Sequence, residues 1–359
     1  MMVIDSTMQI LGYGAVTAVG LTAPQTCAAI RAGIKRFAPI EAPILDDEEA
    51  QIGARVSADP RLRADPGEWL LNLAGRALLE CVGKPAAGAE PALLWLVPEP
   101  ERAHPLSAGV SDSELLRRLE ALVGVRFAPC SRVLRSGAAG CVEALGIARE
   151  LLETQAIAGE VGCVIGGADS LLRKVDLQAL AQGDRLLGPK QSQGLVPGEG
   201  AAFVWVGRAV RTPQSDLPAE ETVAAPEGVC VRGIGLGYER ATVRGTAYSV
   251  GEAFTSALTT ASQDADIPES EIAFIAGNFN GERYDAWEHT HALLRGYRTP
   301  RERLPVVWPS ASVGEIGVAA GVLALVVAAA AIEGDYAAGD TAAVQVRSDG
   351  ELRGVVIVR

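Results

Sequence analysis

Histidine and aromatic residues are scarce in this chain of 359 residues. It contains three histidines, and aromatic residues make up 5% of it. So low an aromatic content argues against an aromatic-lined binding groove, whereas abundant alanine, glycine and valine favour small-residue helices packed closely on buried strands. Because 48% of the residues are hydrophobic, the chain can bury a large core. This composition indicates a layered α/β protein.

Net positive charge is also lacking. The formal net charge is -12 at pH 7, and an acidic protein is repelled by polyanions. We therefore expect neither nucleic acid nor an anionic membrane surface as a partner.

The sequence has no CxxC pair and no secretory signal. Its six cysteines are scattered among mostly apolar neighbours, at Cys27, Cys81, Cys130, Cys141, Cys163 and Cys230. This distribution predicts buried, reduced thiols. The N-terminal residues MMVIDSTMQILGYG lack a positive region followed by an apolar core and a small-residue cleavage site. We therefore predict a cytoplasmic location.

One long apolar segment, 316–332, resembles a membrane span in composition. It reaches only the short end of the usual length. Glu315 precedes it, Glu333 and Asp335 follow it, and no Lys or Arg anchors either flank. We interpret this segment as a buried helix.

Strand and helix patterns alternate along most of the chain. Strand patterns occur at 8–14, 92–97, 132–135, 161–165, 201–206, 231–236, 272–276, 306–307, 341–346 and 354–358. Helical spacing occurs at 23–32, 68–82, 111–123, 141–152, 250–263, 285–294 and 316–332. This alternation predicts largely parallel sheets with helices on their faces. The stretch 211–228, rich in Pro, Glu, Ala and Thr, is typical of a linker between an N-terminal half, 1–210, and a C-terminal half, 229–359.

Four separated segments resemble the β-ketoacyl synthases of fatty-acid and polyketide synthesis. They are QILGYGAVTAVGLTAPQTCAAIRAGIKRF (9–37), GGADSLL (166–172), LVPGEGAAFVWV (195–206) and VGEIGVAAGVLALVVAAAAI (313–332). Their order and spacing also match, and the pairing of GGADSLL with PGEGAA is quite specific to this family. The resemblance implies the thiolase-like fold, a five-layer α-β-α-β-α arrangement of two duplicated halves. It also implies a homodimer formed through the strand that leads to the nucleophile, here 132–135.

The catalytic positions that the resemblance implies carry other residues. A condensing enzyme of this family has a cysteine at the turn before a long helix, whose N-terminus lowers the pKa of the thiol; Ala138 stands there. The family's two histidines, one in an HGT-type motif and one in a GH motif, correspond to Gly277 and Glu315. The loop that supplies an oxyanion donor corresponds to VRSDGELRG, 346–354. Together these losses predict a pseudoenzyme.

Two residues near the nucleophile position are the remaining candidates for a nucleophile. Cys141 lies three residues beyond Ala138, inside the predicted helix, where a packed small residue is the simpler interpretation. Ser136 precedes Ala138 and has no evident base. We assign neither a catalytic role.

The histidines match neither catalytic motif. His104 lies in a Pro-flanked loop, and His289 and His291 lie within one predicted helix. Two residues apart on a helix, the latter pair diverges by about 200 degrees and can neither chelate one metal nor act as a catalytic pair. We expect solvated or locally bonded histidines, and neither a metal nor a cofactor.

Three carboxylates lie within the family-like segments. Glu315 is either a general base with a raised pKa or a negative charge at the first turn of the helix 316–332, which the helix dipole favours. The second interpretation suffices. Asp169 and Glu199 are expected to accept hydrogen bonds from backbone amides at strand ends.

Three classes of function account for these residues. The first is a non-catalytic scaffold, adaptor or chaperone-like protein. Within it, GAVTAVGLTAPQTCAAIRAGI resembles thiolase-like proteins encoded beside bacterial type VI secretion effectors, and an inactive subunit beside an active synthase is a related form. The second is an acyltransferase or hydrolase of acyl thioesters that uses Cys141 or Ser136 with Glu315. The third binds an acyl group or acyl carrier protein without turnover, in an apolar channel ending near Ala138. We predict the first, because it accounts for every substitution.

Overall fold

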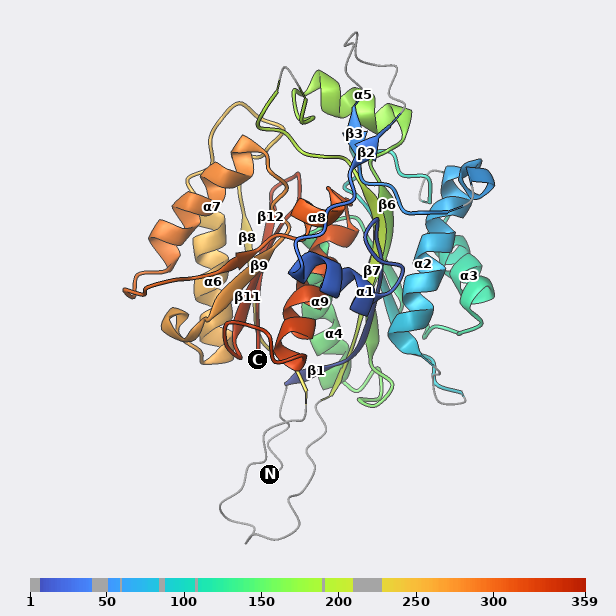
Figure 1. The fold of residues 1–359 in the computed structure, drawn as a ribbon. Helices are drawn as coiled ribbons and strands as arrows, with labels where there is room; N and C mark the ends of the chain where they lie inside the picture. Colours follow the sequence, from blue (N-terminus) through green and yellow to red (C-terminus); the bar gives the residue numbers. More distant parts are fainter. Residues whose placement is uncertain are drawn as a thin grey trace, which may run out of the picture.

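A mixed sheet of ten strands organises the computed structural model, which describes residues 7–40, 51–58, 60–83, 88–106, 109–188, 191–208 and 228–359 (Figure 1). In the described part of the chain the strands are β1 (Met8–Val16), β4 (Ala92–Leu96), β5 (Arg132–Leu134), β6 (Cys163–Ser170), β7 (Glu199–Arg208), β8 (Cys230–Tyr238), β9 (Phe274–Gly277), β10 (Val306–Val307), β11 (Ala342–Arg347) and β12 (Leu352–Val358). A separate ribbon pairs β2 (Ala38–Pro39) with β3 (Ile52–Gly53).

The two halves of the sheet repeat one topology. From the centre outward, one half runs β1-β7-β6-β4-β5 and the other runs β8-β12-β11-β9-β10. In each half the first strand is antiparallel to the fifth and the fifth to the fourth, whereas the remaining pairs are parallel. The two first strands, β1 and β8, pair with each other where Met8 faces Val231. This repeat confirms the prediction of duplicated halves.

The prediction of largely parallel sheets is wrong for about half of the strand pairs. The strands β11 and β12 are joined by a tight hairpin around Asp349, which makes them antiparallel. Parallel pairs occur where a helix crosses between strands, as between β4 and β5 or β9 and β10. The alternation of strands and helices in the sequence does not show how two neighbouring strands are connected. A helical crossover gives a parallel pair, whereas a direct hairpin gives an antiparallel pair.

Helices form the layers on both sides of each half-sheet. They are α1 (Ala23–Arg31), α2 (Pro66–Val82), α3 (Asp112–Val123), α4 (Gly140–Glu153), α5 (Lys174–Gln182), α6 (Glu252–Ala265), α7 (Arg283–Gly296), α8 (Ser310–Val313) and α9 (Ala319–Glu333), with short 3-10 turns at Pro60–Arg63 and Glu269–Glu271. Figure 1 shows α2 and α3 outside one half-sheet, α6 and α7 outside the other, and α4 and α9 between them. This is the expected five-layer arrangement.

The apolar segment 316–332 forms a buried helix, as predicted, but the helix begins later. Almost all residues of α9 are buried, and the helix begins at Ala319 rather than Ile316. Gly317 has a φ of 59°, which turns the chain before the helix starts. Within the described ranges, no helix is both long enough and apolar enough to cross a membrane.

One helix was not predicted from the sequence, and one predicted segment lies outside the described residues. Helix α5 is absent from the sequence prediction, because its polar side chains hide the helical spacing. The predicted linker 211–228 lies outside the described residues, except for Gly228, so the division at that stretch stays a prediction.

The first strand of each half packs on its outer helix through glycine. A Cβ added to Gly14 of β1 would lie 2.0 Å from the carbonyl oxygen of Ala77 in α2. A Cβ added to Gly235 of β8 would lie 1.9 Å from the carbonyl oxygen of Ala257 in α6. Both helices therefore approach their strands so closely that only glycine fits. The two halves share this contact as well as their topology.

We predict that Gly235→Ala destabilises the protein by about 2 to 3 kcal/mol, because the added methyl group meets backbone atoms that cannot move aside. Gly146→Ala is the matched control, since Gly146 is exposed in α4 and its added Cβ would meet nothing within 4 Å. That change should stabilise the protein by about 0.5 to 1 kcal/mol. Urea unfolding of the three proteins measures both values, and equal stabilities would contradict the packing argument.

Candidate functional site

A cavity of about 660 Å³ lies where parallel strands of both halves end. Its lining residues include Pro98 after β4, Leu171 after β6, Asn278 after β9 and Ser348 after β11. The carboxyl ends of parallel strands are where ligand sites form in open α/β sheets. The cavity is therefore the candidate functional site.

Of the three positions that are expected to correspond to the family's catalytic residues, two line this cavity. Ala138 lies in the turn before α4 and Glu315 in the segment before α9, and both are lining residues. Gly277 ends β9 next to the lining residue Asn278. A Cβ added to Gly277 would lie 2.3 Å from the ring of Phe279, so the residue is a site of close packing. The fold thus gathers segments that are distant in the sequence.

The turn before α4 is held by the loop between β11 and β12. The Ser348 hydroxyl accepts a hydrogen bond from the backbone N–H of Ala139 at 2.9 Å and donates one to the carbonyl of Ser136. The backbone N–H of Ser348 bonds the carbonyl of Leu352 at 3.0 Å. The Ser348 hydroxyl therefore supports the turn before α4. The backbone N–H of Ser348 is already bonded within the hairpin of β11 and β12.

Glu315 lies in extended backbone ahead of α9. Its N–H bonds the carbonyl of Val196, and its carbonyl accepts from Gly198, each at 2.8 Å. Its carboxylate accepts hydrogen bonds from the N–H of Gly317 at 2.8 Å and from the side-chain amide of Asn280 at 3.0 Å. The interpretation of Glu315 as a charge in the first helical turn is wrong, because α9 begins four residues later.

Burial raises the pKa of the Glu315 carboxyl to about 7. The nearby Asp349 and Asp285 raise it further, whereas Arg347 and the hydrogen bond from Asn280 lower it. At 9% exposure, desolvation disfavours the charged form more than these partners favour it.

Arg347 is the centre of a buried ion network beside Glu315. Its guanidinium donates to Asp285, to Glu282 at 3.0 Å and to Asp349 at 2.9 Å. Arg185, from the N-terminal half, donates to Glu282 and Asp349 as well. Although burial alone lowers the pKa of Arg347, these carboxylates hold it well above its usual value.

The sequence analysis does not identify this network. A charged residue at the end of the apolar strand AAVQVR is the one signal that could have suggested a buried arginine. Its carboxylate partners come from the start of α7 and from the turn after β11, and two of them also bind Arg185 of the N-terminal half, which no spacing in the sequence relates to them. The pairing is decided by the fold.

Comparison with known proteins supports an assignment of the fold. Protein-family models and curated protein sequences show no match to this chain. One solved structure that matches is AntDE:AntF, a type II PKS acyl-carrier protein in complex with its ketosynthase, with a TM-score of 0.73, 13% identity and coverage of 98% of this chain and 99% of that chain. A second is the ketosynthase ApeO in complex with its chain length factor ApeC from Xenorhabdus doucetiae, with a TM-score of 0.71, 13% identity and coverage of 98% and 97%. A third is the ishigamide ketosynthase/chain length factor, with a TM-score of 0.70, 18% identity and coverage of 98% of each chain.

The chain has the thiolase-like ketosynthase fold. Identities this low show the fold alone.

The two candidate nucleophiles lie outside the cavity lining. Cys141 is 1% exposed within α4, and burial raises the pKa of its thiol to about 12. Ser136 is half-buried, and its hydroxyl donates to the carboxylate of Glu143. The expectation that Ser136 has no base nearby is therefore wrong, because the first turn of α4 brings Glu143 back beside it. Neither nucleophile is placed with Glu315.

None of the three histidines lines the cavity. His104 is buried, with Nε2 at 3.5 Å from Asp169. His289 is buried, and the centroid of its ring lies 4.3 Å from the centroid of the Phe279 ring. Burial lowers the pKa of its imidazole to about 4. His291 is half-buried beside the ring of Trp287. The expectation of a solvated histidine is wrong for His289, because α7 turns that side toward the sheet.

The two motif carboxylates combine the predicted amide bonds with ion pairs. Asp169 accepts from the N–H of Val318 at 3.1 Å and pairs with both terminal nitrogens of Arg102. Glu199 accepts from the N–H of Val56 at 3.0 Å and pairs with Arg63. Their predicted backbone bonds are confirmed, and the arginine partners are additional findings.

We predict that folding stability falls as pH rises from about 4.5 to about 7, in part because of Glu315. The folded state keeps the proton that the unfolded state releases in this range, so the stabilisation from protonated Glu315 is complete below about pH 4.5 and is lost as pH rises through about 7. The loss is on the order of 3 kcal/mol. Urea unfolding between pH 4.5 and 8 should show a flatter profile for Glu315→Gln than for the native chain.

Glu302→Gln is the control for that profile, because Glu302 is exposed and is not among the residues that line the cavity. It should leave the pH dependence unchanged. A native-like slope in Glu315→Gln would show that Glu315 does not hold its proton in the folded protein.

Proposed function

We propose that this chain is a catalytically inactive member of the ketosynthase fold that acts by holding a protein partner. The observation that carries the proposal is the chemistry of the cavity: in the described residues, neither a cysteine nor a histidine lines it. Ala138 occupies the position at which a ketosynthase has its nucleophile. A thioester placed there meets no thiolate to attack it and no imidazole to polarise it.

The charges around the cavity support the same proposal. Four arginines line it, and each is paired with a carboxylate: Arg102, Arg185, Arg244 and Arg347. Paired arginines are held in place by their partners, so they offer little net charge to a substrate. The arrangement favours a structural role for these residues.

Chemistry with a different nucleophile is a weaker candidate. A hydrolase or acyltransferase needs an accessible nucleophile within hydrogen-bond reach of a base. Cys141 is buried away from the cavity, and Ser136 bonds Glu143 outside the lining. Their positions do not support that function.

Binding of an acyl group without turnover is the second candidate. The cavity also contains an apolar side, formed by Leu171, Leu180, Leu195, Val243 and Val318. A volume of about 660 Å³ is within the usual range for small-molecule sites. This observation favours an acyl-binding role that is compatible with a protein partner.

As the partner we propose a second ketosynthase-fold subunit, either another copy of this chain or an active synthase. The edge strand β5 supports this choice, because it pairs only with β4 in the sheet. The carbonyl of Leu134 accepts from Val97 on the β4 side, so the backbone groups of Val133 face outward. An unpaired edge of this kind is a template for another chain. A secretion effector is the alternative partner.

We predict that the native chain forms no covalent adduct with acyl-CoA or acyl-carrier thioesters in intact-protein mass spectrometry. Cys141→Ala and Ser136→Ala should behave identically. Ala138→Cys should become alkylated by iodoacetamide, because position 138 lines the cavity, whereas native Cys141 is 1% exposed. An adduct on the native chain that disappears in Cys141→Ala or Ser136→Ala would overturn the pseudoenzyme proposal.

We predict that the chain sediments as a dimer, alone or with a co-expressed ketosynthase. Val133→Pro removes the outward N–H of β5 and should weaken that dimer at least about tenfold. Val133→Thr keeps the N–H and should dimerise normally. A monomer under both conditions, or an intact dimer in Val133→Pro, would refute the proposed interface and leave an effector as the partner to test.

A further inference from the structure

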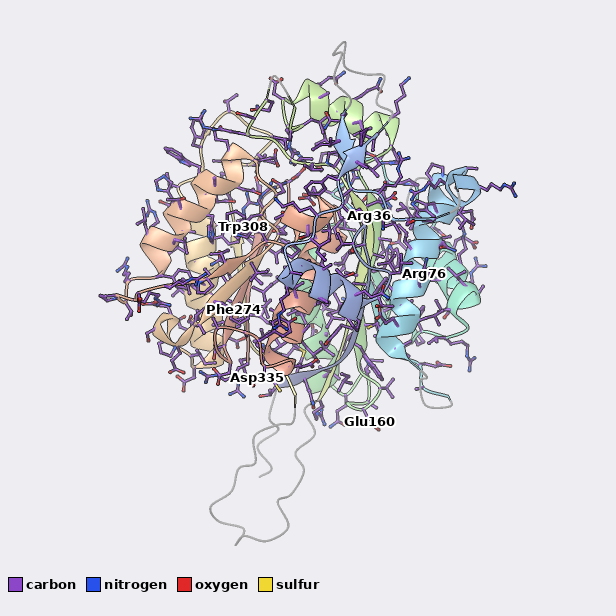
Figure 2. All side chains as sticks on the ribbon, viewed as in Figure 1. Arg36, Arg76, Glu160, Phe274, Trp308 and Asp335 are labelled. Atoms are coloured by element: carbon purple, nitrogen blue, oxygen red, sulfur yellow. The ribbon has the colours of Figure 1, made fainter. Side chains whose placement is uncertain are left out.

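A second cavity, of about 530 Å³, lies on the C-terminal half of the sheet. It is lined by α1 and the residues after it, by β10 and α8, and by the last turns of α9. Figure 2 labels two of its residues, Phe274 and Trp308. It shares no lining residue with the first cavity.

The floor of this second cavity is apolar. Phe274, Val327, Ala331 and Cys27 are each less than 7% exposed. Trp308, at 46% exposure, stands at the mouth. A buried apolar floor below an exposed aromatic ring favours an apolar ligand chain over water.

The rim of the cavity is cationic. Arg31, Lys35 and Arg303 are exposed lining residues, and no carboxylate is among the described residues that line it. Lys35 and Arg303 have no ion-pair partner in the described part of the chain, and the guanidinium of Arg31 lies 4.4 Å from the centroid of the Tyr336 ring. By contrast, all four arginines of the first cavity are paired with carboxylates.

This rim is a local exception in an acidic protein. The chain has a net charge of -12, yet three cations gather here without a lining carboxylate. Bringing like charges together costs free energy unless an anion offsets them. Lysine and arginine side chains form strong hydrogen bonds with carboxylate and phosphate oxygens.

We infer that the second cavity binds an amphipathic anion, a single aliphatic chain that carries a carboxylate or phosphate head. The chain would lie against Phe274 and Val327, and the head would contact Lys35 and Arg303. The volume is sufficient for such a molecule. This inference does not depend on the proposed partner function.

An added peptide strand fits the cavity less well. The neighbouring strand β10 has two residues, and Pro305 and Pro309 flank it closely. Proline has no N–H to donate, and prolines at an edge discourage strand addition. The cavity therefore favours a small amphiphile.

The test uses dodecanoate and dodecyl phosphate, below their micellar concentrations, in titration calorimetry with the full chain. Both should bind with one molecule per chain, whereas acetate and inorganic phosphate should not bind measurably. Dodecyltrimethylammonium, which has the same chain with a cationic head, should bind at least about tenfold more weakly. Equal binding of the two head types would overturn the inference.

A charge-reversal pair locates the head group. Lys35→Glu combined with Arg303→Glu should weaken dodecanoate binding at least about tenfold. Arg76→Glu is the matched control, since Arg76 is exposed on α2, which Figure 2 shows on the other half of the molecule. Retained affinity in the double variant, with its fold verified by thermal unfolding, would refute the site.

A photoreactive dodecanoate locates the chain. Cross-linked peptides should come from 27–35 or 303–312, which line the second cavity. Labelling of 98–103 or 136–139 instead would assign the ligand to the first cavity and overturn the inference. Binding to phosphatidylglycerol vesicles without binding of monomeric dodecanoate would also overturn it, because a lipid surface rather than a single chain would then be the ligand.

Discussion

The buried guanidinium of Arg347 is the contact on which the candidate site depends. Three carboxylates surround it, and two of these also bind Arg185 from the other half of the chain. Removing one partner from a buried ion network leaves an uncompensated charge, which typically costs about 3 to 5 kcal/mol. The network therefore holds the end of β11, the start of α7 and the segment after α5 in one arrangement, beside Glu315 in the cavity wall.

That network also explains the state of Glu315. Two guanidinium groups are shared among Glu282, Asp285 and Asp349, and no cation of the described residues forms an ion pair with Glu315. Its carboxylate instead accepts from Asn280 and Gly317, which are neutral donors. A buried carboxyl with neutral donors and carboxylate neighbours keeps its proton to a higher pH. Glu315 thus carries a carboxyl whose charge is suppressed by its surroundings.

The two cavities differ in how their charges are balanced. In the first, every arginine has a carboxylate partner from the same chain, so the protein itself satisfies the charge. In the second, Lys35 and Arg303 stand at the mouth of an apolar floor, and no described carboxylate lines the cavity. In the first cavity, carboxylates of the protein thus balance the charges of the arginines. In the second cavity, the cations face solvent without a described carboxylate in the lining.

Local patterns were enough to predict most strands and helices, and the resemblance of four segments to the ketosynthases predicted the fold; that Ala138, Gly277 and Glu315 stand in place of catalytic residues stays a prediction. Hydrophobic periodicity and glycine motifs depend on neighbouring residues, and these record which face of an element is buried. The partners of Arg347, the base beside Ser136, the burial of His289 and the cationic rim at Lys35 could not be read in this way. Ser136 meets Glu143 through the local start of α4, but most of the other contacts join distant segments, and only the packing of the two half-sheets and their helices decides which charges meet and which remain alone.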